Sequence, residues 1–236
     1  MEPEPHRRAL IVEGDTTVRR LLRAPLDDLG FTVLDVGDGL EGVRRAHDGR
    51  FDVVLVDVAV PGLDGMAVCR AIRASGPNVH TPLLMLSTRA RDSDAIDSLE
   101  SGADDFVAAP FRPRELQARV GALLRRRERT EHDPPASLVL PLGWRLDARQ
   151  RALVDTTRSI PLTPREFAVL GLLAARADQV VSRDRLRRDV WGEAAPPDNR
   201  VVDLLISRLR KKIESNPRRP RMIRTVWGVG YRLLSD

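Results

Sequence analysis

The chain has 236 residues, with 39 Lys and Arg against 34 Asp and Glu, so its net charge is +5. This length is expected to hold two domains, each large enough for its own core. The single cysteine, Cys69, excludes an internal disulfide, and no apolar stretch approaches the about 20 residues that a membrane span needs. The sequence therefore predicts a cytoplasmic protein that does not bind membranes.

Charge is divided unevenly along the chain. Residues 1–126 carry 17 Arg against 20 acids, whereas residues 140–236 carry 20 Lys and Arg against 11 acids. A basic half is typical of a domain that binds nucleic acid, although a solvated basic surface gives the same count. Residues 127–137 contain two adjacent prolines and predict a linker between a first domain (1–126) and a second domain (138–236).

Short apolar runs alternate with helical patterns in the first domain. One run, Val53–Val56, leads directly to Asp57, and similar runs occupy residues 9–12, 32–36, 82–87 and 106–109. This alternation predicts an α/β fold with a parallel sheet and helices on both faces. Because the ligands of such sheets gather at the carboxyl ends of the strands, we expect Glu13, Asp57 and Ser87 to converge.

The second domain shows signals for three helices and a hairpin. Thr163-Pro164-Arg165-Glu166 is typical of a helix start, with Thr163 as N-cap. A second helix is expected from Ser182 to near Trp191-Gly192, and a third from about Asn199 to Glu214. The segment IRTVWGVGYRL predicts a final hairpin that turns at residues 228–230.

The first half carries VLVDVAVPGLDG, PLLMLS and GADDFVAAPF, and the second half carries LTPREFAVLGLL, RVVDLLISRLRKKI and IRTVWGVGYRL. With these motifs the chain resembles, over nearly its full length, response regulators of the OmpR/PhoB type. The resemblance implies a flavodoxin-like, doubly wound receiver with five parallel strands, followed by a winged helix-turn-helix domain. It also implies a sequence-specific DNA-binding transcriptional regulator, whose partners would be double-stranded DNA, RNA polymerase, a second copy of the chain and a cognate histidine kinase.

In this family an aspartate accepts a phosphoryl group with the help of Mg²⁺, which prefers near-octahedral oxygen ligands. The resemblance makes Asp57 the phosphoacceptor and implies metal ligation by Asp57 and Glu13. The family has two adjacent acids after the first strand, but here Gly14 stands at the position of the second. Ala109 likewise stands where the family has a lysine. We therefore expect weak or absent metal binding and no required cofactor.

Other residues could compensate for these departures. Asp15 could reach the metal, although N-capping of the next helix is its simpler role. Arg89 or Arg91 could supply cationic charge to the pocket. The resemblance assigns the switch to Ser87 and Phe106, and Phe106 is expected to favour a buried rotamer because it lacks a hydroxyl.

Three functional hypotheses follow. The first is a regulator with an atypical receiver that works without phosphorylation, either by constitutive dimerisation or by responding to a small-molecule effector. The second is a conventional phosphorelay regulator activated by Mg²⁺-dependent phosphorylation of Asp57. The third is an aspartyl-phosphate hydrolase, which would need a second acid where Ala59 stands, so we predict that the chain is not an enzyme.

The resemblance also implies two sets of surface residues. The loop at 191–198 matches the segment that touches RNA polymerase in the family. The implied dimer face comprises Asp104, Asp105, Glu115, Arg119 and Arg126. The third helix of the second domain would enter the major groove and the hairpin would form the wing, so the implied DNA contacts are Arg200, Leu204, Ser207, Arg208, Arg210, Lys211, Arg224, Thr225 and Trp227.

Overall fold

The computed structural model describes residues 7–88, 94–132, 138–140, 143–192 and 198–235, with the backbone alone at 95–96 and 126–132. The chain divides into two compact units, Met1–Leu124 and Arg125–Asp236. Each unit has its own apolar core. Within the described residues, no helix is both long and apolar enough to span a membrane.

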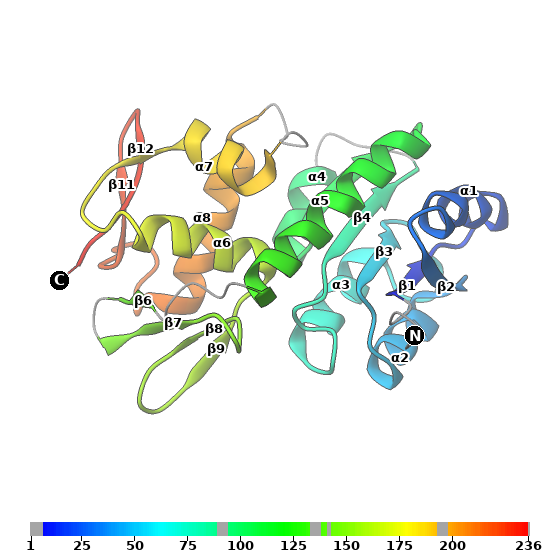
Figure 1. Cartoon of the computed structure of the whole chain (residues 1–236), viewed down its shortest axis with the longest axis horizontal. Coiled ribbons are helices and arrows are strands. Elements are labelled where there is room, and N and C mark those ends of the chain that lie inside the picture. The colour runs from blue at the N-terminus through cyan, green and yellow to red at the C-terminus, as the bar shows by residue number, and fades with distance from the viewer. Residues whose placement is uncertain (1–6, 89–93, 133–137, 141–142, 193–197, 236) are drawn as a thin grey trace. The chain divides into compact units, whose positions relative to one another are not determined.

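The N-terminal unit is a parallel sheet of five strands in the order β2-β1-β3-β4-β5 (Figure 1). Its elements in chain order are β1 (Arg7–Val12), α1 (Thr16–Asp27), β2 (Phe31–Val36), α2 (Gly39–Asp48), β3 (Val53–Asp57), α3 (Gly65–Ala74), β4 (Leu83–Ser87), α4 (Asp94–Ser101), β5 (Asp105–Ala108) and α5 (Pro113–His132). This strand order is the flavodoxin-like, doubly wound arrangement. The fold predicted for the first domain is therefore confirmed.

Two apolar clusters cover the two faces of this sheet. On one face, residues of α1 and α5 such as Leu22 and Val120 pack against alternate strand residues, among them Ile11 and Leu55. On the other face, residues of α2 and α3 pack against the strand residues between them, and the buried Cys69 belongs to this cluster. Strands that are apolar on both faces follow from burial of both faces of a parallel sheet.

The boundary between the domains differs from the sequence expectation. Helix α5 continues to His132, so the first six residues of the segment expected as a linker, 127–132, belong to a helix. The two units divide after Leu124, inside that helix. The adjacent prolines at 134–135 lie outside the described residues.

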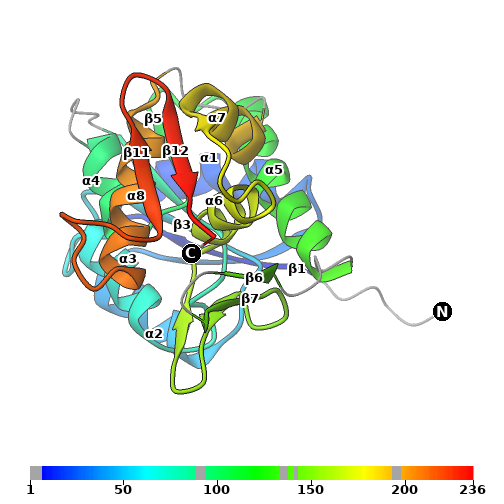
Figure 2. The same ribbon diagram turned by 90° about the vertical axis from the view of Figure 1, so that its left-hand side faces the viewer.

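Beyond the end of α5, the described part of the C-terminal unit combines two antiparallel sheets with three helices. Its elements are β6 (Leu138–Val139), β7 (Arg145–Asp147), β8 (Ala152–Val154), β9 (Ser159–Pro161), α6 (Pro164–Ala174), β10 (Val181–Ser182), α7 (Arg183–Trp191), α8 (Arg200–Ile213), β11 (Ile223–Val226) and β12 (Gly230–Leu233). Strands β10, β12 and β11 form one sheet, and the β11–β12 hairpin stands out clearly in Figure 2. The other sheet, β6-β7-β8-β9, was not predicted, because its strands are only two or three residues long.

The boundaries of α6 and α7 follow from their caps. Thr163 and Glu166 form the expected capping box at the start of α6. Ser182 caps α7, where its hydroxyl accepts a hydrogen bond from the backbone N–H of Arg185 at 3.2 Å. Gly192 ends α7 with a positive φ of 64°, a conformation that glycine adopts without strain. The three predicted helices are therefore confirmed.

Candidate functional site

The acidic pocket expected from the sequence corresponds to a cluster of side chains at the carboxyl ends of β1, β3 and β4. Val12 pairs with Val56 in the sheet, so Glu13 and Asp57 follow at neighbouring positions across the switch between β1 and β3. Ser87 ends the next strand, one position beyond the partner of Asp57. All three side chains are about 3% exposed. The predicted convergence is confirmed at the edge where ligands bind to sheets of this order.

Each of the two carboxylates in this pocket has only one satisfied oxygen. Oδ2 of Asp57 accepts a hydrogen bond from the backbone N–H of Ala59 at 2.9 Å, and Oε1 of Glu13 accepts one from the N–H of Asp15 at 2.8 Å. The other oxygens, Oδ1 of Asp57 and Oε2 of Glu13, are buried without a hydrogen-bond partner. Burial raises the pKa of both carboxyls, and the nearby charge of Asp57 raises the pKa of Glu13 further.

Two features of this pocket weigh against a complete magnesium site. A Cβ atom added to Gly14 would lie 2.7 Å from Cδ of Pro61, so the ring of Pro61 fills the space that a second acid would enter. Ala109 lies beside Ser87, to whose carbonyl it donates a backbone hydrogen bond of 2.8 Å, and its methyl group supplies no charge. The two orphaned oxygens would accept a cation, but within the described residues no group of three His, Cys, Asp or Glu is arranged to hold a metal ion. The described side chains therefore do not fit the full ligand set that Mg²⁺ takes in the family.

Asp15 caps the N-terminus of α1 through hydrogen bonds to backbone N–H groups. Its Oδ1 accepts hydrogen bonds from the N–H groups of Thr17 and Val18, at 2.6 and 3.2 Å. These bonds lower the pKa of Asp15, which is exposed and acts as the N-cap. Arg19, which the sequence reasoning missed, donates from Nη1 to the carbonyls of Glu13 and Gly14 at 2.6 and 3.0 Å. It therefore holds the loop after β1 through main-chain contacts.

The switch hydroxyl already has an acceptor within the chain. Oγ of Ser87 donates a hydrogen bond of 2.9 Å to Oδ2 of Asp94, the first residue of α4, whose charge also raises the pKa of Asp57. Asp94 is 8% exposed. Sequence reasoning missed it, although an acid seven residues after Ser87 was a visible signal. Phe106 is half-buried and packs against the core cluster on its side of the sheet.

The residues expected on a dimer face do not all lie on a surface. Asp104 is fully buried and pairs with Arg73 at 2.7 Å, so its assignment to that face is wrong. Its carboxylate also accepts from the backbone N–H of Leu83, and a residue that ties α3 to β4 is unavailable to a partner. Arg119 pairs with both Asp105 and Glu115, at 3.1 and 3.0 Å. The side chain of Arg126 lies outside the described residues.

In the C-terminal unit, one stripe of α8 is open to solvent. Arg200, Leu204, Ser207 and Lys211 follow one another at helical spacing, and each is exposed or half-exposed. The side chain of Arg200 is 74% exposed, although Asp198 lies 3.4 Å from its Nε. These four residues keep the placement that the sequence predicts.

Arg208 faces the interior, so its assignment as a DNA contact is wrong. Its side chain is only 12% exposed and lies 3.5 Å from Oε1 of Glu166, which is fully buried. Lys212 binds the other carboxylate oxygen of Glu166 at 2.7 Å. Burial opposes ionisation of Glu166, but Arg208 and Lys212 outweigh it and lower the pKa. Position 208 falls on the flank of α8 that packs on α6, which periodicity alone did not resolve.

Arg210 links α8 to the hairpin. It donates to the carbonyl of Ile223 at 2.7 Å and to Oγ1 of Thr225 at 2.9 Å, and it stacks over the ring of Tyr231. Arg210 and Thr225 therefore stabilise the wing, and their placement contradicts a role as freely projecting DNA contacts. Arg224 is exposed, and the side chain of Trp227 is 88% exposed in the turn of the hairpin.

A second network between α7, α8 and β12 was not predicted. Oδ1 of Asp203 accepts hydrogen bonds from the hydroxyl of Tyr231 at 2.6 Å and from Nε of Arg183 at 2.8 Å. Burial, together with the bond to Asp203, raises the pKa of Tyr231 to about 12. Because these partners lie far apart in sequence, no local pattern reveals the network.

Some predicted sites fall outside the described residues. They are Arg89 and Arg91, expected to add charge to the acidic pocket, and most of the loop expected to touch RNA polymerase, 193–197.

Comparison with known proteins assigns a family to each unit. Residues 9–121 match the family model described as response regulator receiver domain, and residues 157–233 match that described as transcriptional regulatory protein, C terminal. The chain is 38% identical to the DNA-binding response regulator MtrA of Mycolicibacterium paratuberculosis over 225 residues, which cover 95% of this chain and 97% of that protein. It is also 38% identical to the transcriptional regulatory protein AfsQ1 of Streptomyces coelicolor, over 95% of this chain and 96% of that protein.

Solved structures show the same architecture. DrrB of Thermotoga maritima, described as an OmpR/PhoB homologue, is 32% identical and covers 98% of this chain with all of its own, at a TM-score of 0.50. A mutant of RitR covers the same shares at a TM-score of 0.80, and at 22% identity it indicates the fold alone.

Proposed function

The chain belongs to the OmpR/PhoB-type family of DNA-binding response regulators, and we propose that its receiver controls DNA binding without phosphorylation of Asp57. Transfer of a phosphoryl group to a carboxylate depends on cations that stabilise the charge developing on the phosphoryl oxygens. In this pocket Gly14 and Ala109 replace two of the groups that supply or hold such cations. Among the described residues, neither Glu13 nor Asp57 forms an ion pair with a cationic side chain.

The hydrogen bond from Ser87 to Asp94 is the observation that carries this proposal. In the family the corresponding hydroxyl binds the phosphoryl group. Here Oδ2 of Asp94 accepts that bond at 2.9 Å, and both side chains are buried. Because Asp94 begins α4, the bond ties α4 to the end of β4. A chain that supplies its own acceptor does not need a phosphoryl group to hold these two elements together.

We also infer that the chain forms a homodimer through β5 and α5. Asp105 on β5 and Glu115 on α5 both pair with Arg119, at 3.1 and 3.0 Å. Glu115 is the more accessible of the two acids, with its side chain 41% exposed. A cation from a second copy that pairs with this exposed carboxylate would fix the orientation of the two chains. RNA polymerase as a partner, and a kinase or small molecule acting on the receiver, stay predictions.

A conventional phosphorelay is the alternative, and the two orphaned oxygens of Glu13 and Asp57 favour it because they would accept a cation. One experiment separates the two functions. The purified chain is incubated with a small phosphodonor and Mg²⁺, and its intact mass is measured beside that of Asp57→Asn. Our proposal predicts no stoichiometric gain of a phosphoryl group in either protein. A gain that is present in the wild type and absent in the variant would establish the conventional function.

A further inference from the structure

A loop rich in arginine connects α8 to the wing. This arginine loop, residues 215–222, carries Arg218 and Arg219 between two prolines and Arg221 directly after the second, and all three arginines are exposed. Their guanidinium groups form no hydrogen bond or ion pair among the described residues. Several other arginines of the same unit, such as Arg183 and Arg200, lie beside an acid of their own chain. The loop therefore presents cationic charge that no neighbouring carboxylate offsets.

The loop has a defined shape despite its exposure. Oε1 of Glu214 accepts hydrogen bonds from the backbone N–H groups of Met222 and Ile223, and Oε2 accepts one from that of Arg221, at 2.7–3.0 Å. At the other end of the loop, Oδ1 of Asn216 accepts from the N–H of Arg218 at 3.0 Å. The backbone is thus fastened at both ends, and binding a ligand would require little further ordering of the loop.

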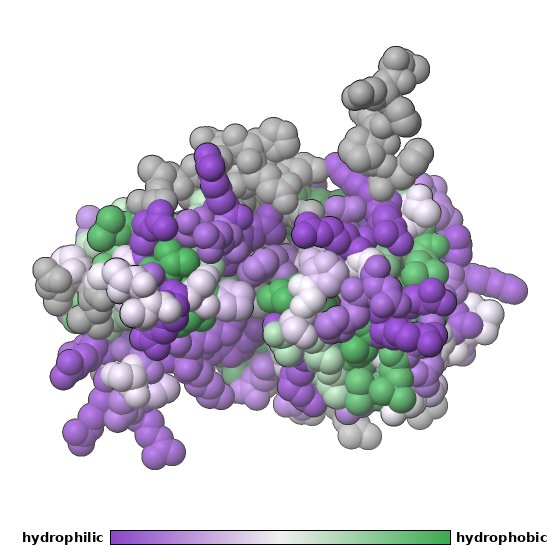
Figure 3. Space-filling model, turned by 90° about the horizontal axis from the view of Figure 1, so that it is seen from below, coloured by the Kyte–Doolittle hydropathy of each residue, from purple (hydrophilic) through white to green (hydrophobic). Residues whose placement is uncertain are grey.

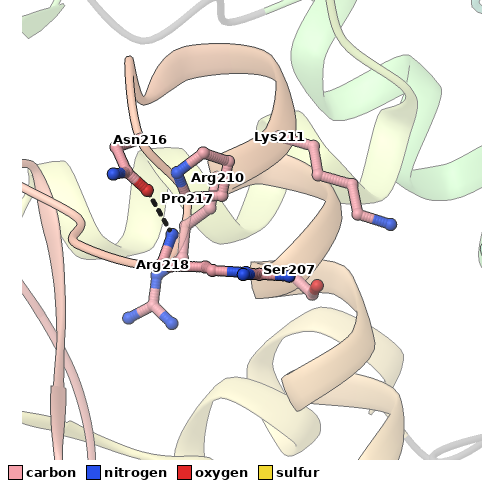
Figure 4. A pocket seen from close by; sticks show the side chains of 6 residues that line it. All are labelled: Ser207, Arg210, Lys211, Asn216, Pro217 and Arg218. Carbon is pink, nitrogen blue, oxygen red and sulfur yellow. Dashed lines mark hydrogen bonds between the residues drawn. The ribbon is translucent and has the colours of Figure 1, made fainter.

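A pocket of about 440 Å³ lies between the loop and the end of α8 (Figure 4). It is lined by Ser207, Arg210 and Lys211 from the helix and by Asn216, Pro217 and Arg218 from the loop. Ser207 and Lys211 also belong to the solvent-exposed stripe of α8. The pocket is therefore continuous with the surface expected to face DNA, and its volume falls in the range of sites that enclose small organic groups.

Helix length indicates which part of DNA would reach this place. The 14 residues of α8 span about 21 Å, whereas the major groove of B-DNA is about 12 Å wide. An end of α8 that crosses the groove consequently approaches one of the flanking phosphate backbones. Long hydrophilic side chains stand out from the C-terminal unit on the face seen in Figure 3, at its left.

We propose that the arginine loop binds the sugar–phosphate backbone of DNA beside the segment that α8 reads, with a backbone phosphate entering the pocket beside Arg218. The loop adds affinity that is independent of sequence, because phosphate contacts position a protein without reading bases. This inference rests on the DNA binding of the family and not on the state of Asp57. A negative result for the arginine loop therefore does not refute phosphorylation-independent control, and the reverse also holds.

The test measures the salt dependence of DNA binding by the full chain. Binding to a short fluorescent duplex of arbitrary sequence is followed by anisotropy over a series of salt concentrations. Each lost phosphate contact reduces the magnitude of the negative slope of log K against log salt by about 0.9. We expect such a reduction for Arg218→Ala and a larger one when Arg218, Arg219 and Arg221 are all changed to Ala. The reduction should be the same on duplexes of different sequence.

Two controls accompany this test. Arg218→Lys keeps the charge and should retain the wild-type slope, and Arg70→Ala, an exposed arginine on α3, should leave the slope unchanged despite the same change in net charge. An unchanged slope in the triple variant would overturn the proposal. If the triple variant instead lost transcriptional activity at an unchanged slope, the loop would bind an acidic surface of a protein partner. That result also contradicts the proposal. Absence of DNA binding by the wild type would refute the family function instead.

Discussion

Oγ of Ser87 lies 2.9 Å from Oδ2 of Asp94 and donates a hydrogen bond to it, so the hydroxyl at the end of β4 is satisfied by the first residue of α4. An unphosphorylated receiver that lacked such an acceptor would leave this hydroxyl to water. The contact gives α4 a fixed position relative to the strand that ends beside Asp57.

Removing this acceptor should uncouple α4 from β4. We predict that Asp94→Ala weakens DNA binding severalfold and shifts the chain toward monomers, because the bond that replaces the phosphoryl contact is lost. Analytical ultracentrifugation and anisotropy measure the two effects. Asp97→Ala, an exposed acid of the same helix, is the matched control and should change neither. An Asp94→Ala protein with wild-type assembly and affinity would contradict the role of Asp94.

Introducing an acid at position 14 should destabilise the folded chain. The added Cβ meets Pro61 at 2.7 Å, so Gly14→Asp is expected to lower the free energy of unfolding by about 1–3 kcal/mol through overpacking. Ala109→Lys should leave stability unchanged, because Ala109 is exposed. Chemical denaturation of the two variants checks the contrast, and equal stabilities would show that Pro61 moves aside freely. Calorimetry with Mg²⁺ should detect tighter metal binding only when position 14 is an acid.

The fold follows from local patterns, whereas parts of the sites do not. Apolar runs and caps were predictable because they depend on periodicity and on short-range chemistry. The doubly wound arrangement of the receiver strands was implied by the family resemblance instead. The roles of Arg208 and Asp104 were not, since each depends on a buried partner from another element, Glu166 and Arg73 respectively. Family position suggested exposure for both residues, but burial of a charge requires a paired charge that only the tertiary structure reveals.

Burial of Asp57 should make stability depend on pH. Its pKa is raised above the ordinary 3.8, so the folded chain holds this proton more tightly than the unfolded chain does. The contribution of Asp57 to the free energy of unfolding therefore falls as the pH rises above 3.8 and is least favourable at neutral pH. We predict that Asp57→Asn is more stable than the wild type by about 1 kcal/mol at pH 7, and that the difference narrows toward pH 4. Thermal melts of both proteins across this range test the sign, and a difference that widens on acidification would contradict it.

We predict that Arg208→Ala and Arg200→Ala reduce DNA binding for different reasons. Arg208→Ala removes one of two cations from the buried Glu166, so it should cost about 3 kcal/mol of stability and reduce DNA binding through unfolding. Arg200→Ala affects an exposed side chain and should reduce affinity for a specific site at an unchanged melting temperature. Melting curves recorded beside binding curves distinguish these outcomes. An Arg208→Ala protein of normal stability and reduced affinity would return Arg208 to the DNA-contacting face.

Phosphorylation independence is tested most directly by the affinity of the full chain for a specific DNA site obtained by in vitro selection. Wild type and Asp57→Asn are compared before and after treatment with a small phosphodonor and Mg²⁺. The four dissociation constants should agree within about twofold, a difference of about 0.4 kcal/mol. A tightening of about tenfold on treatment, seen in the wild type and lost in Asp57→Asn, would contradict phosphorylation-independent control.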